Sequence, residues 1–166
     1  FKLKNILNVI IMKLLIVESP AKAKTIKNYL DDNFEVVSSI GHFRDLPEKG
    51  IGIEEDENFT VKEWVVDKKK ADPLIKGIKK ASEVFLALDP DREGELIAWH
   101  VVELCKEKKL TNNKTFKRIE FSAVRKTDIL EAINKPRDIN QNLVNAAITR
   151  RFLDKFFGYK ISPITT

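Results

Sequence analysis

Two short apolar segments each end in an acidic residue, and a proline follows within two positions. Residues 14–17 (LLIV) lead into Glu18-Ser19-Pro20, and residues 84–88 (VFLAL) lead into Asp89-Pro90. A short apolar run bounded by turn signals is typical of a buried strand, and a capping residue before proline is typical of a helix start. Each unit therefore predicts a strand that passes directly into a helix.

The alternation of strand and helix continues along the chain. Further strands are predicted at 34–38, 59–66 and 117–121, and helices are predicted at 20–31, 72–82 and 127–133. A helix after Pro90 is predicted to bury Ile97, Val101, Leu104 and Cys105, which share one helical face. Strands that alternate with helices form parallel βαβ units, so the predicted fold class is α/β, a Rossmann-like parallel sheet flanked by helices.

The composition restricts the kind of protein this is. The 166 residues are 43% hydrophobic, enough for a folded core, and the formal charge of +5 permits a nucleic-acid partner without requiring one. The single cysteine excludes an internal disulfide and fits a reducing, cytoplasmic setting. The apolar run near the N-terminus is too short and too interrupted to span a bilayer. We interpret residues 1–11 as an extension before a natural start at Met12.

Four acidic residues at alternate positions follow the second apolar segment: Asp89, Asp91, Glu93 and Glu95. Carboxylates this close repel one another unless a cation takes up the charge. Because ligand sites in parallel sheets form beyond the carboxyl ends of the strands, Glu18 is expected to face Asp89 and Asp91, with Glu93 as a further candidate. Hard oxygen ligands supplemented by water suit magnesium.

Each acid also has a simpler interpretation. Asp89 could be only the N-cap of the next helix, with Asp91 favoured in its first turn by the helix dipole. Glu93 and Glu95 could simply face solvent. For one acid alone this is the better interpretation, but the whole set together with Glu18 favours a metal site.

The composition changes near Pro136, and residues 139–157 predict one long helix. Arg151, Lys155 and Tyr159 fall at i, i+4 and i+8 and share a stripe if that helix continues. Two cations and an aromatic ring suit single-stranded nucleic acid. Arg150 and Asp154 form a second i, i+4 pair, which could be a plain ion pair, and periodicity alone would favour an ordinary amphipathic helix.

Four segments of the sequence resemble those of the bacterial type IA DNA topoisomerases. Two look like the signature motifs of the family's Toprim domain, a third lies between them, and a fourth lines the family's single-strand groove; they are residues 17–26 (VESPAKAKTI), 89–100 (DPDREGELIAWH), 39–47 (SIGHFRDLP) and 150–163 (RRFLDKFFGYKISP). The likeness runs from Met12 to about Pro163. It implies a Toprim domain at 12–134, followed at 135–166 by the start of a helical DNA-gate domain.

The resemblance also implies a reaction and roles for several residues. Family members cut one DNA strand through a 5′-phosphotyrosine, pass the other strand and reseal without ATP, which relaxes negative supercoils. Glu18 would handle the proton of the 3′ oxygen, Lys22 would stabilise the phosphoryl transition state, and Mg²⁺ would be bound by acids that include Glu18; the others are Asp89, Asp91 and Glu93. The implied DNA contacts are Arg92, Arg150, Arg151, Asp154, Lys155 and Tyr159. Arg92 could equally be a counter-charge for its acidic neighbours. Lys155 replaces the usual arginine, which weakens the case for bidentate contact there.

The family's nucleophilic tyrosine has no counterpart here, because neither Tyr29 nor Tyr159 lies in a matching context. We therefore expect an N-terminal piece of the enzyme, monomeric, cytoplasmic and nucleoid-associated, that binds DNA and metal but cannot cleave alone. Two alternatives stay open: a self-sufficient Toprim nuclease or primase-like enzyme, and a non-catalytic nucleic-acid-binding module.

Overall fold

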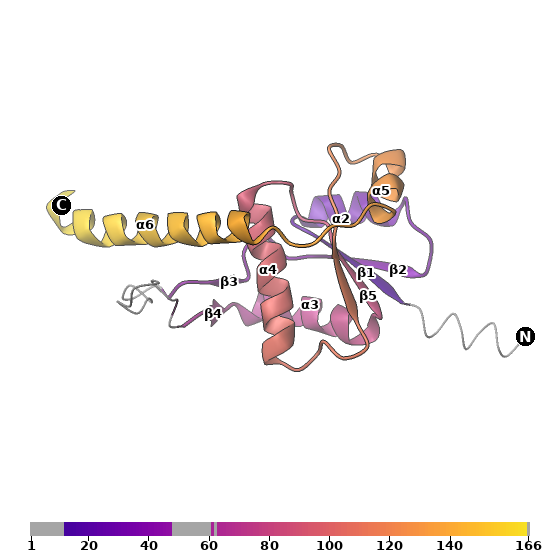
Figure 1. The fold of residues 1–166 in the computed structure, drawn as a ribbon, viewed down its shortest axis with the longest axis horizontal. Coiled ribbons are helices and arrows are strands. Elements are labelled where there is room, and N and C mark those ends of the chain that lie inside the picture. Colours follow the sequence, from indigo (N-terminus) through magenta and orange to yellow (C-terminus); the bar gives the residue numbers. More distant parts are fainter. Residues whose placement is uncertain (1–11, 48–60, 62, 166) are drawn as a thin grey trace, which may run out of the picture.

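The computed structural model describes residues 12–47, 61 and 63–165. The predicted extension at 1–11 and residues 59, 60 and 62 of the predicted strand at 59–66 lie outside the described residues; within that predicted strand the structure has a two-residue strand at Val65–Val66. The elements are β1 (Lys13–Val17), α2 (Pro20–Lys27), β2 (Phe34–Ser38), β3 (Arg44–Asp45), β4 (Val65–Val66), α3 (Lys68–Lys80), β5 (Glu83–Leu86), α4 (Arg92–Glu107), β6 (Thr115–Arg118), α5 (Lys126–Ile133) and α6 (Gln141–Thr165). Figure 1 shows helices around a central sheet, from which α6 projects as a long arm.

The central sheet is parallel throughout, with the strand order β2-β1-β5-β6. The chain leaves β1 toward one edge and leaves β5 toward the other edge, so the direction of winding reverses between these two central strands. Their carboxyl ends are the topological switch point, where ligands bind in open α/β sheets. The predicted α/β class is confirmed, and so is the neighbouring position of the two strands that end in acids.

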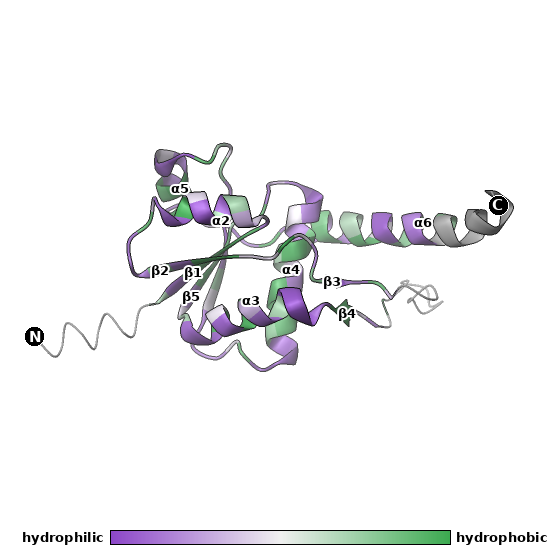
Figure 2. Ribbon diagram, turned by 180° about the vertical axis from the view of Figure 1, so that it is seen from behind, coloured by the Kyte–Doolittle hydropathy of each residue, from purple (hydrophilic) through white to green (hydrophobic). Residues whose placement is uncertain are grey.

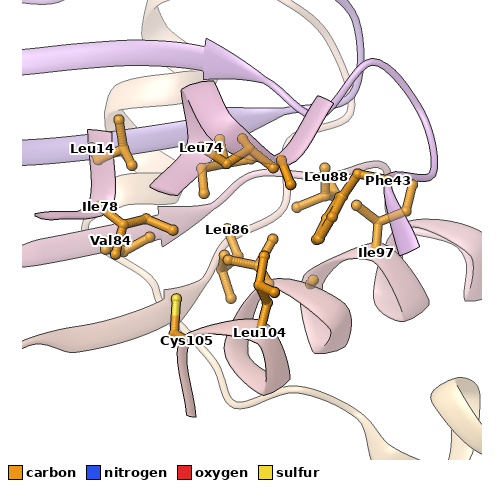
Figure 3. Packing of buried hydrophobic residues seen from close by; sticks show 14 of the residues in the cluster. Leu14, Phe43, Leu74, Ile78, Val84, Leu86, Leu88, Ile97, Leu104 and Cys105 are labelled. Carbon is orange, nitrogen blue, oxygen red and sulfur yellow. The ribbon is translucent and has the colours of Figure 1, made fainter. Parts of the chain in front are cut away.

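The core has two layers because alternate side chains of a strand point to opposite faces. Leu14 and Ile16 of β1 join a cluster with α3 and α4, whereas Leu15 and Val17 join one with Ile26 of α2 and with α5. Figure 3 shows the first cluster, in which Leu86 lies among side chains from α3 and α4. Figure 2 shows hydrophobic colouring along the central strands and on much of α4. Burial on both faces fixes the register of the central strands.

The start of α3 differs from the prediction. Asp67 caps the helix by accepting from the main-chain N–H of Lys69 at 3.1 Å, so α3 begins at Lys68 rather than at Asp72-Pro73. Pro73 lies inside the helix, where it cannot donate a main-chain hydrogen bond. The burial of Leu74 and Ile78 against the sheet offsets that loss.

The first turns of α6 pack on α4. Val144 and Ala147 are fully buried against Leu96 of α4. No helix within the described ranges is long and apolar enough to cross a membrane.

We predict that Leu86→Ala lowers the free energy of unfolding by about 2–5 kcal/mol, because it leaves a cavity between β5 and the helices. Leu86 is fully buried. Leu130→Ala on α5 is the matched control, since Leu130 is 41% exposed, and it should change stability by less than about 0.5 kcal/mol. Urea denaturation measures both; equal losses would contradict the assigned core.

Candidate active site at the carboxyl end of the sheet

Glu18 directly follows β1, and the segment after β2 holds its main chain. The hydroxyl of Ser38 and the N–H of Gly41 donate to the Glu18 carbonyl at 3.0 and 3.1 Å. Gly41 has a φ of +69°, in the left-handed region that favours glycine. The GHFRDLP segment therefore begins with a turn that fixes the position of Glu18.

Lys22 reaches across from the first turn of α2 to the other acidic strand end. Ser19 caps α2 by accepting from the Lys22 N–H at 3.2 Å, with Pro20 next, as predicted. The Lys22 ammonium lies 2.6 Å from a carboxylate oxygen of Asp89. Both side chains are about one-third exposed, at 36% and 34%, so solvent and ligands can reach this ion pair.

Glu18 and Asp89 share a hydrogen bond between their carboxyl groups. The pKa of Glu18 is raised to about 7, first by burial and then by the hydrogen bond to Asp89 and the negative charges of Asp89 and Asp91, while Lys22 opposes the increase. The pKa of Asp89 is lowered, chiefly by the same hydrogen bond. The pair thus holds a proton on Glu18 beside an ionised Asp89, which suits proton transfer near neutral pH.

The turn from β5 into the first residues of α4 (residues 87–93, hereafter the acidic turn) has a fixed shape. Asp91 is the N-cap of α4 and accepts from the Gly94 N–H at 2.7 Å. A Cβ atom on Gly94 would lie 2.0 Å from the carbonyl oxygen of Asp89, so only glycine fits there. The cap is therefore Asp91 and not Asp89, and the Asp89 side chain is left for Lys22 and Glu18.

Glu93 points toward other partners. Its Oε2 atom lies 3.0 Å from Nε2 of His42 and 3.2 Å from the guanidinium of Arg151. Within the part of the chain that the structure describes, no three Asp, Glu, His or Cys side chains form a group ready to hold a metal. The structure thus brings together Glu18, Lys22 and Asp89 and leaves Glu93 apart.

Sequence reasoning missed a buried ion pair beneath the acidic turn. Arg118 of β6 and Glu95 of α4 are both fully buried and 2.7 Å apart. The Arg118 guanidinium also donates to the carbonyls of Leu88 at 2.6 Å and of Asp89 at 2.7 Å. Glu95 therefore does not face solvent as the simple interpretation held. A signal was available: Glu95 stands directly before an unbroken apolar run at 96–98.

Glu95 also anchors the segment that leads to α6. Its carboxylate accepts from the guanidinium of Arg137 and from the N–H of Asn140 at 3.0 Å. Arg137 forms an isolated β-bridge with Arg118. The start of α6 is thus tied to the acidic turn and to the edge of the sheet.

The predicted DNA contacts fall into two groups. Arg92, Arg150 and Asp154 line one pocket of about 540 Å³ between the start of α4 and α6; the rest of its lining is Ala146, Thr149, Leu153 and Phe157. Arg151 lies apart from this pocket and forms an ion pair with Asp45. Lys155 is half-buried on α6, and the side chain of Tyr159 lies outside the described residues.

The two histidines have different surroundings. His100 is buried between Trp64, Trp99 and Arg44, and burial lowers its pKa to about 3, with the charge of Arg44 adding to the effect. This residue is a neutral part of the core. His42 lies at the acidic turn, where burial, and then Arg151, lower its pKa.

We predict that Glu18 makes the stability of the protein depend on pH. Because its pKa is raised in the folded state, its stabilising contribution is complete below the ordinary value of 4.5 and is lost as pH rises through about 7. Wild type should therefore lose stability relative to Glu18→Gln between these values, as measured by urea denaturation. Parallel pH profiles for the two proteins would contradict the raised pKa.

Asp89→Asn should shift the titration midpoint of Glu18 to lower pH, as followed by carboxyl NMR.

Comparison with known proteins agrees with this geometry. The Toprim domain family matches residues 13–124. The protein named DNA topoisomerase 1 from Rickettsia felis is 51% identical over 156 residues, which are 92% of this chain and 20% of the relative. Its namesake from Xylella fastidiosa is 45% identical over 153 residues, 91% of this chain and 19% of the relative.

A solved structure gives the same result. Full-length topoisomerase I from Thermotoga maritima superposes with a TM-score of 0.75 at 40% identity, over 91% of this chain and 25% of that one. The chain thus spans about a fifth of the length of the curated relatives it matches. The resemblance inferred from the sequence motifs is confirmed. The chain is similar to the topoisomerase I proteins, and it belongs to the Toprim domain family.

Proposed function

We propose that this chain is the part of a type IA DNA topoisomerase that handles the phosphate, the proton and the divalent cation during strand cleavage and rejoining. The observation that carries the proposal is the contact of Glu18, Lys22 and Asp89 across the switch point between β1 and β5. This site combines a proton donor, a cation and a carboxylate. These are the groups that phosphoryl transfer needs, since its catalysis is mainly positioning and charge neutralisation.

Glu18 is the proton carrier in this proposal. With a pKa of about 7 it can give a proton to the 3′ oxygen that leaves during cleavage and take it back during rejoining. Lys22 neutralises the phosphate. The Lys22 ammonium forms an ion pair with Asp89. A scissile phosphate bound beside Asp89 would be a second anionic partner for it.

The carboxylates at this site fit a hard divalent cation. Two acids raise the pKa of Glu18, and Lys22 is the positive charge that opposes this effect, so negative charge is in excess. We propose that Asp89 and Asp91 hold the cation, Mg²⁺, with Glu18 beside them and water completing the coordination. Glu93 would join only on leaving Arg151. The bound cation would supply charge neutralisation at the phosphate.

The proposed partner is DNA, held as a single strand near α6. Arg92 and Arg150 supply positive charge on either side of the α4–α6 pocket, beside the half-exposed side chains of Leu153 and Phe157. A pocket with charged and apolar walls suits the phosphate and base of one nucleotide. The tyrosine that attacks the DNA, the passage of the second strand and the relaxation of supercoils belong to the proposed whole enzyme.

We predict that Asp89→Asn and Asp91→Asn each weaken Mg²⁺ binding at least tenfold, about 1.4 kcal/mol, because each removes a charged ligand. Isothermal titration calorimetry measures the dissociation constants. Asparagine caps helices about as well as aspartate, so Asp91→Asn keeps the start of α4. Asp67→Asn is the matched control, since Asp67 caps α3 in the same way and its hydrogen bonds are to α3 and to Phe43. Equal affinities in all four proteins would refute the cation site.

We also predict that residues 1–166 alone do not relax supercoiled plasmid. Tyr29 packs against the core cluster of α2 and α5, and Tyr159 lies two helical turns beyond Arg151, about 12 Å along α6. Gel analysis with Mg²⁺ should show unchanged topoisomers. Relaxation with a covalent protein–DNA adduct would show that one of these tyrosines is the nucleophile, whereas nicking without an adduct would favour a Toprim nuclease.

A further inference from the structure

Arg151 joins three parts of the molecule that are far apart in the sequence. Its guanidinium donates to both carboxylate oxygens of Asp45, at 2.9 and 2.5 Å, and to Glu93 at 3.2 Å. The nitrogen that contacts Glu93 also lies 3.3 Å from Nε2 of His42. One side chain of α6 thus contacts the GHFRDLP segment and the acidic turn together.

These contacts hold Glu93 away from the other acids. Arg151 neutralises the Glu93 carboxylate, and Nε2 of His42 lies 3.0 Å from the same carboxylate oxygen. A carboxylate engaged in this way is a poor ligand for a cation, because the cation would have to displace the guanidinium. This explains why Glu93 remains apart although it is two residues from Asp91.

The ion pairs of Arg151 can be exchanged. The side chains of Asp45 and Glu93 are 45% and 39% exposed, so water and a DNA phosphate can reach both ion pairs. A phosphate binds guanidinium with two parallel charge-assisted hydrogen bonds, as a carboxylate does. A DNA strand lying along α6 therefore offers Arg151 an equivalent partner.

We propose that Arg151 couples DNA binding to cation binding. When a DNA phosphate takes the guanidinium, Glu93 loses its counter-charge and becomes available to the cation beside Asp91. Single-stranded DNA then raises the affinity for the cation, and the cation raises the affinity for DNA by the same factor. This inference rests on the proposed function and adds to it the order in which the site is completed.

The neighbouring arginine provides a matched control. Arg150 has the same charge and lies on the same helix, but it faces the α4–α6 pocket and pairs only loosely with Asp154, at 3.7 Å. Its removal weakens DNA binding through lost charge without touching Glu93.

The test is calorimetric titration of residues 1–166 with Mg²⁺, with and without a short single-stranded oligonucleotide, at matched ionic strength. In wild type the oligonucleotide should strengthen Mg²⁺ binding about fivefold or more. In Arg151→Gln, Mg²⁺ should bind more tightly without DNA than in wild type, and the oligonucleotide should no longer change its affinity. Arg150→Gln should bind the oligonucleotide more weakly and keep the wild-type coupling factor.

A metal-free measurement separates this inference from the proposed function. Addition of the oligonucleotide should shift the carboxyl NMR signal of Glu93 in wild type and in Arg150→Gln, but not in Arg151→Gln. Coupling that persists in Arg151→Gln would mean that the phosphate acts on the cation directly, and would overturn the inference while the proposed function stands. A chain that binds neither Mg²⁺ nor the oligonucleotide would overturn both.

Discussion

The buried ion pair of Arg118 and Glu95 holds together the segments from which the site is built. Arg118 donates to the carbonyls at the end of β5 and in the acidic turn. Glu95 accepts a hydrogen bond from the N–H of Asn140, directly before α6. Neither side chain is exposed, so removal of one partner would leave an unpaired buried charge, which costs about 3–5 kcal/mol. The turn that carries Asp89 therefore cannot shift without breaking this network.

A fixed turn matters for the proposed function, because the proposed chemistry of the site is electrostatic. Burial raises the pKa of Glu18, and Asp89 adds to the increase only while it stays close to the Glu18 carboxyl. Two further constraints keep Asp89 there: the cap that Asp91 places on α4, and the close approach of Gly94 to the Asp89 carbonyl. Preorganised charge of this kind acts without the cost of rearranging at the moment of reaction.

Sequence patterns predicted that Glu18 and Asp89 lie at one edge of the sheet, because strand alternation and parallel order place them there by local rules. The strand bounds were less accurate, since β5 ends at Leu86 rather than at Leu88 and β6 spans Thr115–Arg118 rather than 117–121. They predicted helix starts unevenly. Ser19-Pro20 begins α2, but Asp72-Pro73 does not begin α3, because Asp67 supplies an earlier cap and core burial tolerates Pro73. The pattern of an acid before proline cannot reveal which capping group the chain will use.

Side-chain partners distant in sequence were beyond prediction. Glu95 meets Arg118 from 23 residues away, and Arg151 meets Asp45 from 106 residues away. A helical stripe indicates which residues share a face but not what that face contacts, so Arg151 was expected to meet DNA alone.

The central claim is that acids from two neighbouring strands meet around one cation. It is tested most directly by a crystal structure of residues 1–166 soaked in Mn²⁺, with the ion located from its anomalous scattering. The account predicts one strong peak within coordination distance of Asp89 and Asp91, with the Glu18 carboxyl beside it. An ion bound elsewhere, or a Glu18 side chain turned away from Asp89 while the acidic turn stays empty, would contradict it.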